Sequence, residues 1–286
     1  MSLLNTLIHD PFFQMALWAS LLASLASGTI GSFVVIKRIA FLAGSISHSV
    51  LGGLGACIWL QRTYHISWLD PLYGAFIAAV LSALLLGWVH LHYRQREDAI
   101  IAAIWSTGMA IGVIFLSFTP GTNVDLMNFL FGNILWISTQ DLILLGLLDL
   151  VIFIFIFIYY NRFLAICFDE QQALLRGIPV QRLYFLLLCL VAVSIVLLIQ
   201  IIGTILVIAL LTLPATIACL FTHRLPVIML LATFFSSFFS LTGLCAAYWL
   251  DWPPGSTIAL LAAASYLILL PVQNKKKSWR KKLKAT

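Results

Sequence analysis

The sequence predicts an all-α integral membrane protein that crosses the bilayer eight or nine times. Its 286 residues are 62% hydrophobic and only 9% charged, and the mean hydropathy is +1.07. A soluble domain usually has about 25% charged residues, so this chain has too few to cover a water-facing surface. Apolar runs of about 20 residues, the length of a membrane-crossing helix, recur from end to end. A β-barrel is disfavoured because runs such as VIFIFIFIYY do not alternate between apolar and polar residues.

The apolar runs place the predicted spans in order along the chain. They lie near Ala16–Ile36, Phe41–Leu60, Leu72–Val89, Ile100–Phe118, Leu142–Tyr160, Leu183–Ile202, Ile205–Phe221, Val227–Leu250 and Ile258–Val272. The run Leu126–Trp136 is shorter, which favours a re-entrant or surface helix over a crossing. Residues 201–221 contain Gly203 and Pro214, so a broken or partly re-entrant helix is expected there, and the count stays open between eight and nine.

Basic residues predict the orientation, because loops rich in Lys and Arg stay in the cytoplasm. If the Lys37–Arg38 turn is cytoplasmic and the spans alternate, 15 of the 16 Lys and Arg fall inside and only Arg62 falls outside. We therefore expect the N-terminus outside and the C-terminus in the cytoplasm. The seven basic residues in the tail over 274–286 suit contact with anionic lipid headgroups and require no nucleic acid. A single transmembrane domain is expected over residues 1–286.

A histidine in the second predicted span is the main candidate functional residue. His48, in AGSISHSVLGGLG, lies about seven residues or ~10 Å into this span. Gly44, Ser45, Gly52 and Gly55 share its helix face. Such a face either lets another helix approach closely or leaves room for water and a solute. Because imidazole binds divalent metals and ionisable residues in a membrane usually face a cavity or a partner, His48, Ser45 and Gly44 are candidates for a translocation path. The alternative is that His48 hydrogen-bonds across a tight helix pair.

Two carboxylates are further candidates for this path. Asp149, in LLDLVIF, is the only carboxylate deep in a predicted span. It either supplies negative charge to a cation path or makes a structural polar contact. Asp125 opens the short helix after a Pro-Gly turn, where it either favours the helix dipole or contacts the metal. The five cysteines are scattered without a CxxC pair, which is typical of packing residues rather than of a disulfide or zinc framework.

The longest internal connection, Asn161–Phe185, is a candidate docking segment for a soluble partner. The charge pattern makes it cytoplasmic, and Phe168–Arg176 is expected to form an amphipathic helix of about two and a half turns. Gly177 closes this helix and Pro179 prevents its continuation. A short helix parallel to the membrane suits docking, while the alternative is an ordinary loop helix.

These motifs resemble the permease subunits of bacterial ABC importers for zinc, manganese and iron. The resemblance covers nearly the whole chain, through GSFVVIKRIAFLAGSISHSVLGGLG, NVDLMNFLFGNIL, FDEQQALLRGIPVQRL, IIGTILVIALLTLPATIA and PPGSTIALLAA in the family's order. It implies a dimerising subunit of the inner membrane, paired with itself or with a related permease, that is not an enzyme and has no permanently bound cofactor. A separate cytoplasmic subunit would hydrolyse ATP, and an extracytoplasmic binding protein would deliver the transported zinc, manganese or iron.

The resemblance also implies roles for particular residues. His48 matches a histidine in the second span that is implicated in metal passage. Many members have an aspartate four residues earlier, where this chain has Gly44, so one carboxylate of the expected pair is missing. The coupling segment would be residues 161–183, and its residues at the ATP-hydrolysing subunit would be Asp169, Glu170, Ala173, Gly177 and Ile178.

Two other classes of protein fit the sequence less well. A secondary transporter or channel working alone would use several intramembrane acids for ion coupling, and this chain offers essentially Asp149. An intramembrane metalloprotease would need an HExxH motif, which the sequence lacks. The sequence also lacks GxxxxGK[ST], so the energy for ATP-driven transport would come from another polypeptide.

Overall fold

A computed structural model describes residues 11–66, 68–92, 97–120, 126–132, 134 and 137–283, apart from the side chains of residues 97, 126–128 and 272–283. Within these ranges the chain is helical with no strand, which confirms the predicted all-α class. Nine of the described helices are long and apolar enough to cross a membrane. Of the two predicted numbers of spans, eight and nine, the described helices therefore match nine.

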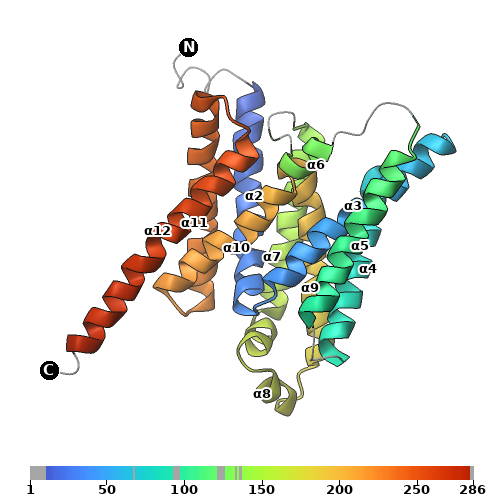
Figure 1. Cartoon of the computed structure of the whole chain (residues 1–286). Coiled ribbons are helices and arrows are strands. Elements are labelled where there is room, and N and C mark those ends of the chain that lie inside the picture. The colour runs from blue at the N-terminus through green and yellow to red at the C-terminus, as the bar shows by residue number, and fades with distance from the viewer. Residues whose placement is uncertain are drawn as a thin grey trace.

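The nine long helices extend most of the predicted spans by a few residues. They are α2 (Pro11–Ile36), α3 (Ala40–Thr63), α4 (Pro71–His92), α5 (Glu97–Ser117), α7 (Thr139–Phe168), α9 (Val180–Ile202), α10 (Thr204–Phe221), α11 (Leu225–Leu250) and α12 (Pro254–Leu283) (Figure 1). Two short helices, α6 (Leu126–Phe131) and α8 (Glu170–Leu175), lie between them. The predicted short helix near 126–136 is α6, which ends before Gly132, a residue with φ of +69°.

The stretch expected to be a broken helix consists of two helices with the break at Gly203. Gly203 has φ 78° and ψ 162°, a conformation that is essentially restricted to glycine. Pro214 lies inside α10 without ending it. Each helix on either side of Gly203 is a candidate membrane span, so the glycine rather than the proline divides this stretch.

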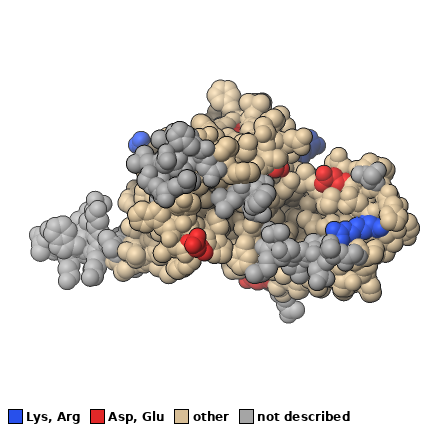
Figure 2. All heavy atoms as spheres, turned by 90° about the horizontal axis from the view of Figure 1, so that it is seen from above, with Lys and Arg blue, Asp and Glu red and all other residues tan. Residues whose placement is uncertain are grey.

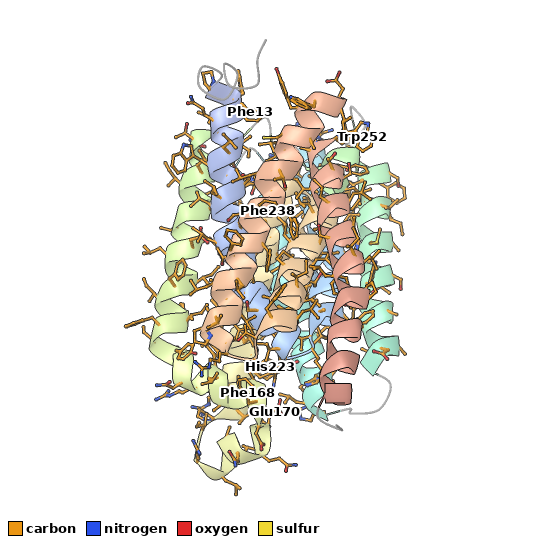
Figure 3. The ribbon with its side chains drawn as sticks, turned by 90° about the vertical axis from the view of Figure 1, so that its left-hand side faces the viewer. Phe13, Phe168, Glu170, His223, Phe238 and Trp252 are labelled. Carbon is orange, nitrogen blue, oxygen red and sulfur yellow. The ribbon has the colours of Figure 1, made fainter. Side chains whose placement is uncertain are left out.

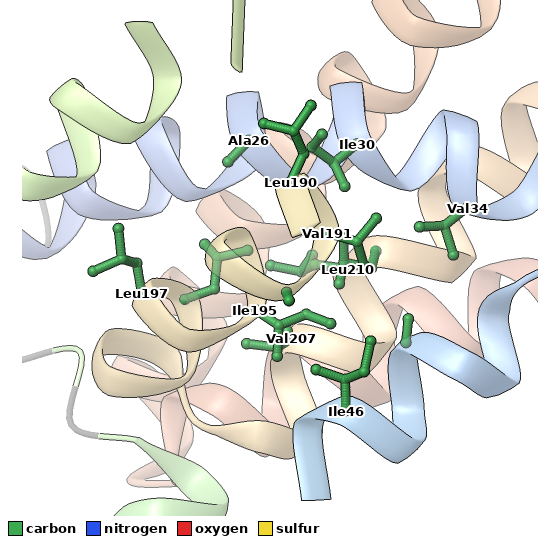
Figure 4. Close-up of a cluster of buried hydrophobic side chains, with 14 of the residues drawn as sticks. Ala26, Ile30, Val34, Ile46, Leu190, Val191, Ile195, Leu197, Val207 and Leu210 are labelled. Carbon is green, nitrogen blue, oxygen red and sulfur yellow. The ribbon is translucent and has the colours of Figure 1, made fainter. Parts of the chain in front are cut away.

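Helices α2, α9 and α10 form the buried centre of the bundle. Their aliphatic side chains meet Ile46 of α3 in one cluster (Figure 4). The most apolar windows of α2, α3 and α9 are 72% buried, whereas that of α5 is 11% buried. Because α5 contributes little to the core, it lies at the edge of the bundle, where its surface is open to lipid or to another chain.

The helices place the described basic turns at one end of the bundle. Figure 3 shows Phe168, Glu170 and His223 at one end and Phe13 and Trp252 at the other. The first end, which holds α8, is the one predicted to be cytoplasmic. Arg62, the predicted exception, lies near the far end of α3 from the α2–α3 turn. The opposite end has a described surface that is mostly uncharged (Figure 2).

Candidate cation path beside His48

Glycines hold α3 tightly between α4 and α5. A methyl group added at Gly52 would lie 2.9 Å from the carbonyl oxygen of Gly108, and one added at Gly55 would lie 2.7 Å from that of Gly112. Both distances are shorter than a side-chain carbon tolerates, so the two glycines allow α5 to approach. Of the two uses predicted for this glycine face, Gly52 and Gly55 serve close helix packing rather than space for a solute.

The three candidate residues of the first turns of α3 meet one region of α5. The imidazole of His48 stacks on the indole of Trp105, with ring centroids 4.3 Å apart and planes 9° from parallel. Ser45 Oγ donates a hydrogen bond of 3.0 Å to the carbonyl oxygen of Ile101. A methyl group at Gly44 would meet only Trp105, at 4.0 Å. Gly44 thus has room for an added methyl group, unlike Gly52 and Gly55.

The imidazole of His48 is half-buried and held by stacking rather than by a hydrogen bond at Nδ1. Nδ1 is buried and has no hydrogen-bond partner among the described residues. A neutral imidazole with an unpaired ring nitrogen is a good ligand for a divalent cation. Since Nδ1 is covered, a cation would reach it only after the neighbouring groups that cover this atom move away.

Trp105 is a site residue that the sequence analysis did not single out. The available signal is its position, because tryptophans of membrane helices concentrate at the membrane surface. Trp105 lies instead near the middle of α5, in the small-residue run AAIWSTGMAIG. A tryptophan at mid-span beside small residues indicates a specific partner, which here is His48.

The carboxylates are not part of the contact between His48 and α5. Asp149 is 6% exposed on α7, and neither carboxylate oxygen has a hydrogen-bond partner in the described part of the chain. Helix α7 packs mainly on α2 and α9, whereas α3 packs mainly on α5 and α4. Asp125 lies outside the described residues. The described residues contain no group of three or more His, Cys, Asp and Glu that could hold a metal ion.

The predicted coupling helix starts two residues later than expected. Phe168 is the last residue of α7, and Asp169 interrupts the helix with extended backbone at φ −153° and ψ 103°. Asp169 then caps α8, because its Oδ1 accepts hydrogen bonds from the backbone N–H groups of Gln171 and Gln172 at 2.9 and 3.0 Å. The prediction of one continuous helix over 168–176 was wrong because the cap signal of Asp169 outweighed the amphipathic pattern.

Other residues of the coupling segment have one of two places: some stabilise α8 and the turn after it, and others are exposed to the surroundings of the bundle. Ala173 is 1% exposed, and its carbonyl oxygen accepts from the N–H of Ile178 at 3.1 Å. Gly177 has φ 72° and closes the turn after α8. Leu174 and Leu175 are 59% and 88% exposed. This helix therefore presents an apolar surface at the end of the bundle, where it stands out from the long helices (Figure 1).

Comparison with known proteins relates the whole arrangement to metal transport. The chain matches the model of the ABC 3 transport family over residues 9–273. It is 46% identical over 277 residues to a protein of Chlamydia pneumoniae named "probable metal transport system membrane protein", covering 96% of this chain and 94% of the relative. It is 32% identical over 265 residues to the manganese transport system membrane protein MntC of Halalkalibacterium halodurans, covering 92% and 88%. A chain in the structure of PsaBC from Streptococcus pneumoniae in complex with Fab superposes with a TM-score of 0.81, at 29% identity and 93% coverage of both chains.

Proposed function

The chain belongs to the ABC 3 transport family and is a membrane permease of a metal transporter, and from this premise we propose that it imports a divalent transition-metal cation in an ATP-driven complex. Zinc, manganese and iron are the proposed cargoes. Manganese is the first to test, because the relative in Halalkalibacterium halodurans is named for manganese transport.

The observation that most supports ATP-driven coupling is the surface of α8. A helix of six residues with a full N-terminal cap is held firmly, yet it leaves Leu174 and Leu175 largely exposed. Two neighbouring exposed leucines on a fixed helix outside the bundle are suited to an apolar pocket on another protein. We place a cytoplasmic ATP-hydrolysing subunit on this surface, with Asp169, Glu170, Ala173, Gly177 and Ile178 forming the coupling segment.

The proposed cation path runs beside His48. His48 would act as a transient ligand, because a transport site must release its ion. Ser45 and Gly44 would line the same place. Asp149 would contribute negative charge from α7, and Asp125 is proposed as a further contact of the metal.

The exposed helix α5 suits contact with a second permease subunit. Its outward surface carries Ser106 and Thr107 together with small alanines, and small and hydroxyl residues favour helix association in membranes. Such a contact, with an identical or a related chain, would place two copies of the His48 region close to the dimer interface. An extracytoplasmic binding protein would deliver the metal at the opposite end from α8. We propose an inner-membrane orientation with the N-terminus outside, since 15 of 16 Lys and Arg then face the cytoplasm.

The test is co-purification with a candidate ATP-binding subunit from the same organism, followed by uptake in proteoliposomes. The binding protein is supplied outside and ATP inside, and zinc, manganese and iron are assayed separately. We expect co-purification and ATP-dependent uptake of at least one metal. Leu175→Ser should weaken co-purification. Leu147→Ser is the matched control, because Leu147 is a leucine of α7 that is 57% exposed outside the coupling segment, and it should leave co-purification unchanged.

Two outcomes would contradict the proposal. Uptake that proceeds without ATP and without an associated ATPase would favour the alternative, a secondary transporter or channel that works alone. Uptake of none of the three metals by the assembled complex would show that the cargo lies outside the proposed class.

A further inference from the structure

Lys37 is the buried basic residue at the end of the bundle that holds α8. Its side chain is 8% exposed, and it forms an ion pair with Glu170 of α8. A buried ammonium group without partners would be strongly unfavourable, so the contacts of Lys37 are specific features of the fold rather than chance surface contacts.

Lys37 contacts three further parts of the structure besides its own turn. Its Nζ donates to the carbonyl oxygen of Ile166 at the end of α7, at 2.6 Å, in addition to the pair with Glu170. The same Nζ lies 5.8 Å from the ring centroid of Tyr184 on α9, within the range of a cation–π interaction. The Tyr184 ring in turn lies 5.0 Å from the ring of His90 near the end of α4. One ammonium group therefore joins the α2–α3 turn to α7, α8 and α9.

The connection from Lys37 to the His48 helix is short and stiff. Only Arg38 and Ile39 separate Lys37 from the first residue of α3. The backbone N–H of Lys37 donates to Phe33 at 2.9 Å, and that of Ile39 donates to Val34 at 2.9 Å, so the turn is fixed to α2. Ile39 is 3% exposed and its carbonyl oxygen accepts from Ala43 of α3 at 3.1 Å. A displacement of Lys37 would thus be passed to α3 rather than absorbed by a loose loop.

His48 lies within reach of such a displacement. It is eight residues beyond the start of α3, or about 12 Å along the helix axis. Its stacking partner Trp105 belongs to α5, a helix that is not among those described as contacting the Lys37 side chain. A shift of α3 relative to α5 would therefore change the stack that orients the His48 ring.

We propose that Lys37 is a positioning residue that transmits the movement of α8 to α3, and so couples ATP hydrolysis to the opening of the path at His48. This inference rests on the proposed function, because it requires an ATP-hydrolysing subunit bound at α8. It connects the coupling segment around α8 with the candidate cation path at His48, which lie in separate sequence motifs. The side chain of Arg38, the neighbouring residue, is exposed, so its charge is not part of the proposed link.

The test measures the number of metal ions transported per ATP hydrolysed by the reconstituted complex of permease, ATP-binding subunit and binding protein. This ratio is chosen because a loss of folded or assembled complex lowers both quantities together and leaves it unchanged. The variants are Lys37→Met, which keeps the side-chain length without the charge, and Lys37→Arg, which keeps the charge. Arg38→Met is the matched control, since it removes a positive charge one residue away.

We expect Lys37→Met to lower the ratio at least about fivefold, the lower end of typical coupling between two sites. Lys37→Arg and Arg38→Met should each lower the ratio by less than about fivefold. If Lys37→Met does not assemble, Glu170→Gln decides, because it neutralises the partner with little change in shape and should lower the ratio by a similar factor. The inference would be overturned if Lys37→Met, or Glu170→Gln where Lys37→Met does not assemble, lowered the ratio by less than this factor. An equal fall of the ratio in Arg38→Met would also overturn it. Absence of ATP-dependent uptake by the unaltered complex would instead overturn the proposed function.

Discussion

The stack between His48 and Trp105 gives the account its most specific prediction. Replacing Trp105 with leucine keeps an apolar side chain on α5 but removes the parallel indole, 4.3 Å from the imidazole. Aromatic pairs of this kind contribute about 0.5–1.5 kcal/mol beyond the area they bury. Since Nδ1 has no hydrogen bond within the described structure, no other contact at that atom replaces the stack in orienting the ring.

The size of the change in KM follows from the fraction of time that the His48 imidazole keeps the orientation that it has in the stack on Trp105. A loss of about 0.5–1.5 kcal/mol reduces the favoured orientation by a factor of about 2 to 13 at 25 °C, and the apparent affinity for the cation falls by up to the same factor. We therefore expect Trp105→Leu to raise the KM for metal uptake by this factor, while ATP hydrolysis without metal is unchanged.

The assay is the concentration dependence of ATP-driven metal uptake in proteoliposomes. Trp249→Leu is the matched control, because Trp249 is 76% exposed near the end of α11 and should leave KM unchanged. An unchanged KM in Trp105→Leu would refute the argument that the indole orients the imidazole. An equal rise in Trp249→Leu would mean that the change reflects the loss of any tryptophan.

Three further substitutions test the packing and the buried charge. Gly52→Ala should lower the free energy of unfolding by about 1–3 kcal/mol through overpacking against α5. Gly146→Ala is the control, because nothing lies within 4 Å of the added methyl group, and it should be neutral or stabilising in thermal unfolding. Equal shifts in the two variants would contradict the overpacking argument. Gly203→Ala should cost at least about 1–3 kcal/mol because its φ of 78° is strained for alanine, and a normal yield of folded protein would oppose it. Asp149→Leu should raise the unfolding free energy by about 1–3 kcal/mol, since it removes an unpaired buried carboxyl group, while lowering uptake; a more stable protein with unchanged uptake would assign Asp149 no part in transport.

The sequence was sufficient for the order and approximate bounds of the long helices, and it left their number open between eight and nine. Apolar runs of membrane-spanning length are a strong signal, because the backbone polar groups in lipid are satisfied within each helix. Helix ends were less well predicted. The start of α8 depended on Asp169, whose side chain stabilises a cap at a position where the apolar pattern alone favours a continuous helix. The helix breaks at Gly203 because glycine can adopt the backbone conformation found there. Pro214 lies within α10 without breaking it.

The site was predicted on one helix but not across helices. Helical periodicity placed Gly44, Ser45 and His48 together, and the structure places all three against α5. The identity of the partner, Trp105, could not be read from either helix alone, because the pairing depends on how α3 and α5 are aligned. The same holds for Lys37 and Glu170, which are 133 residues apart in the chain. Contacts of this kind depend on tertiary packing, which local sequence patterns do not encode.

The most direct measurement is uptake of zinc, manganese and iron by the His48→Ala complex, with co-purification of the ATP-binding subunit as the check on assembly. If the imidazole binds the passing cation, uptake of the transported metal should fall at least about tenfold, since loss of even an outer-shell partner of a metal ligand typically costs about 10–100-fold. The variant should still co-purify with the ATP-binding subunit. Unchanged uptake of all three metals would contradict the account and leave His48 as a packing residue beside Trp105.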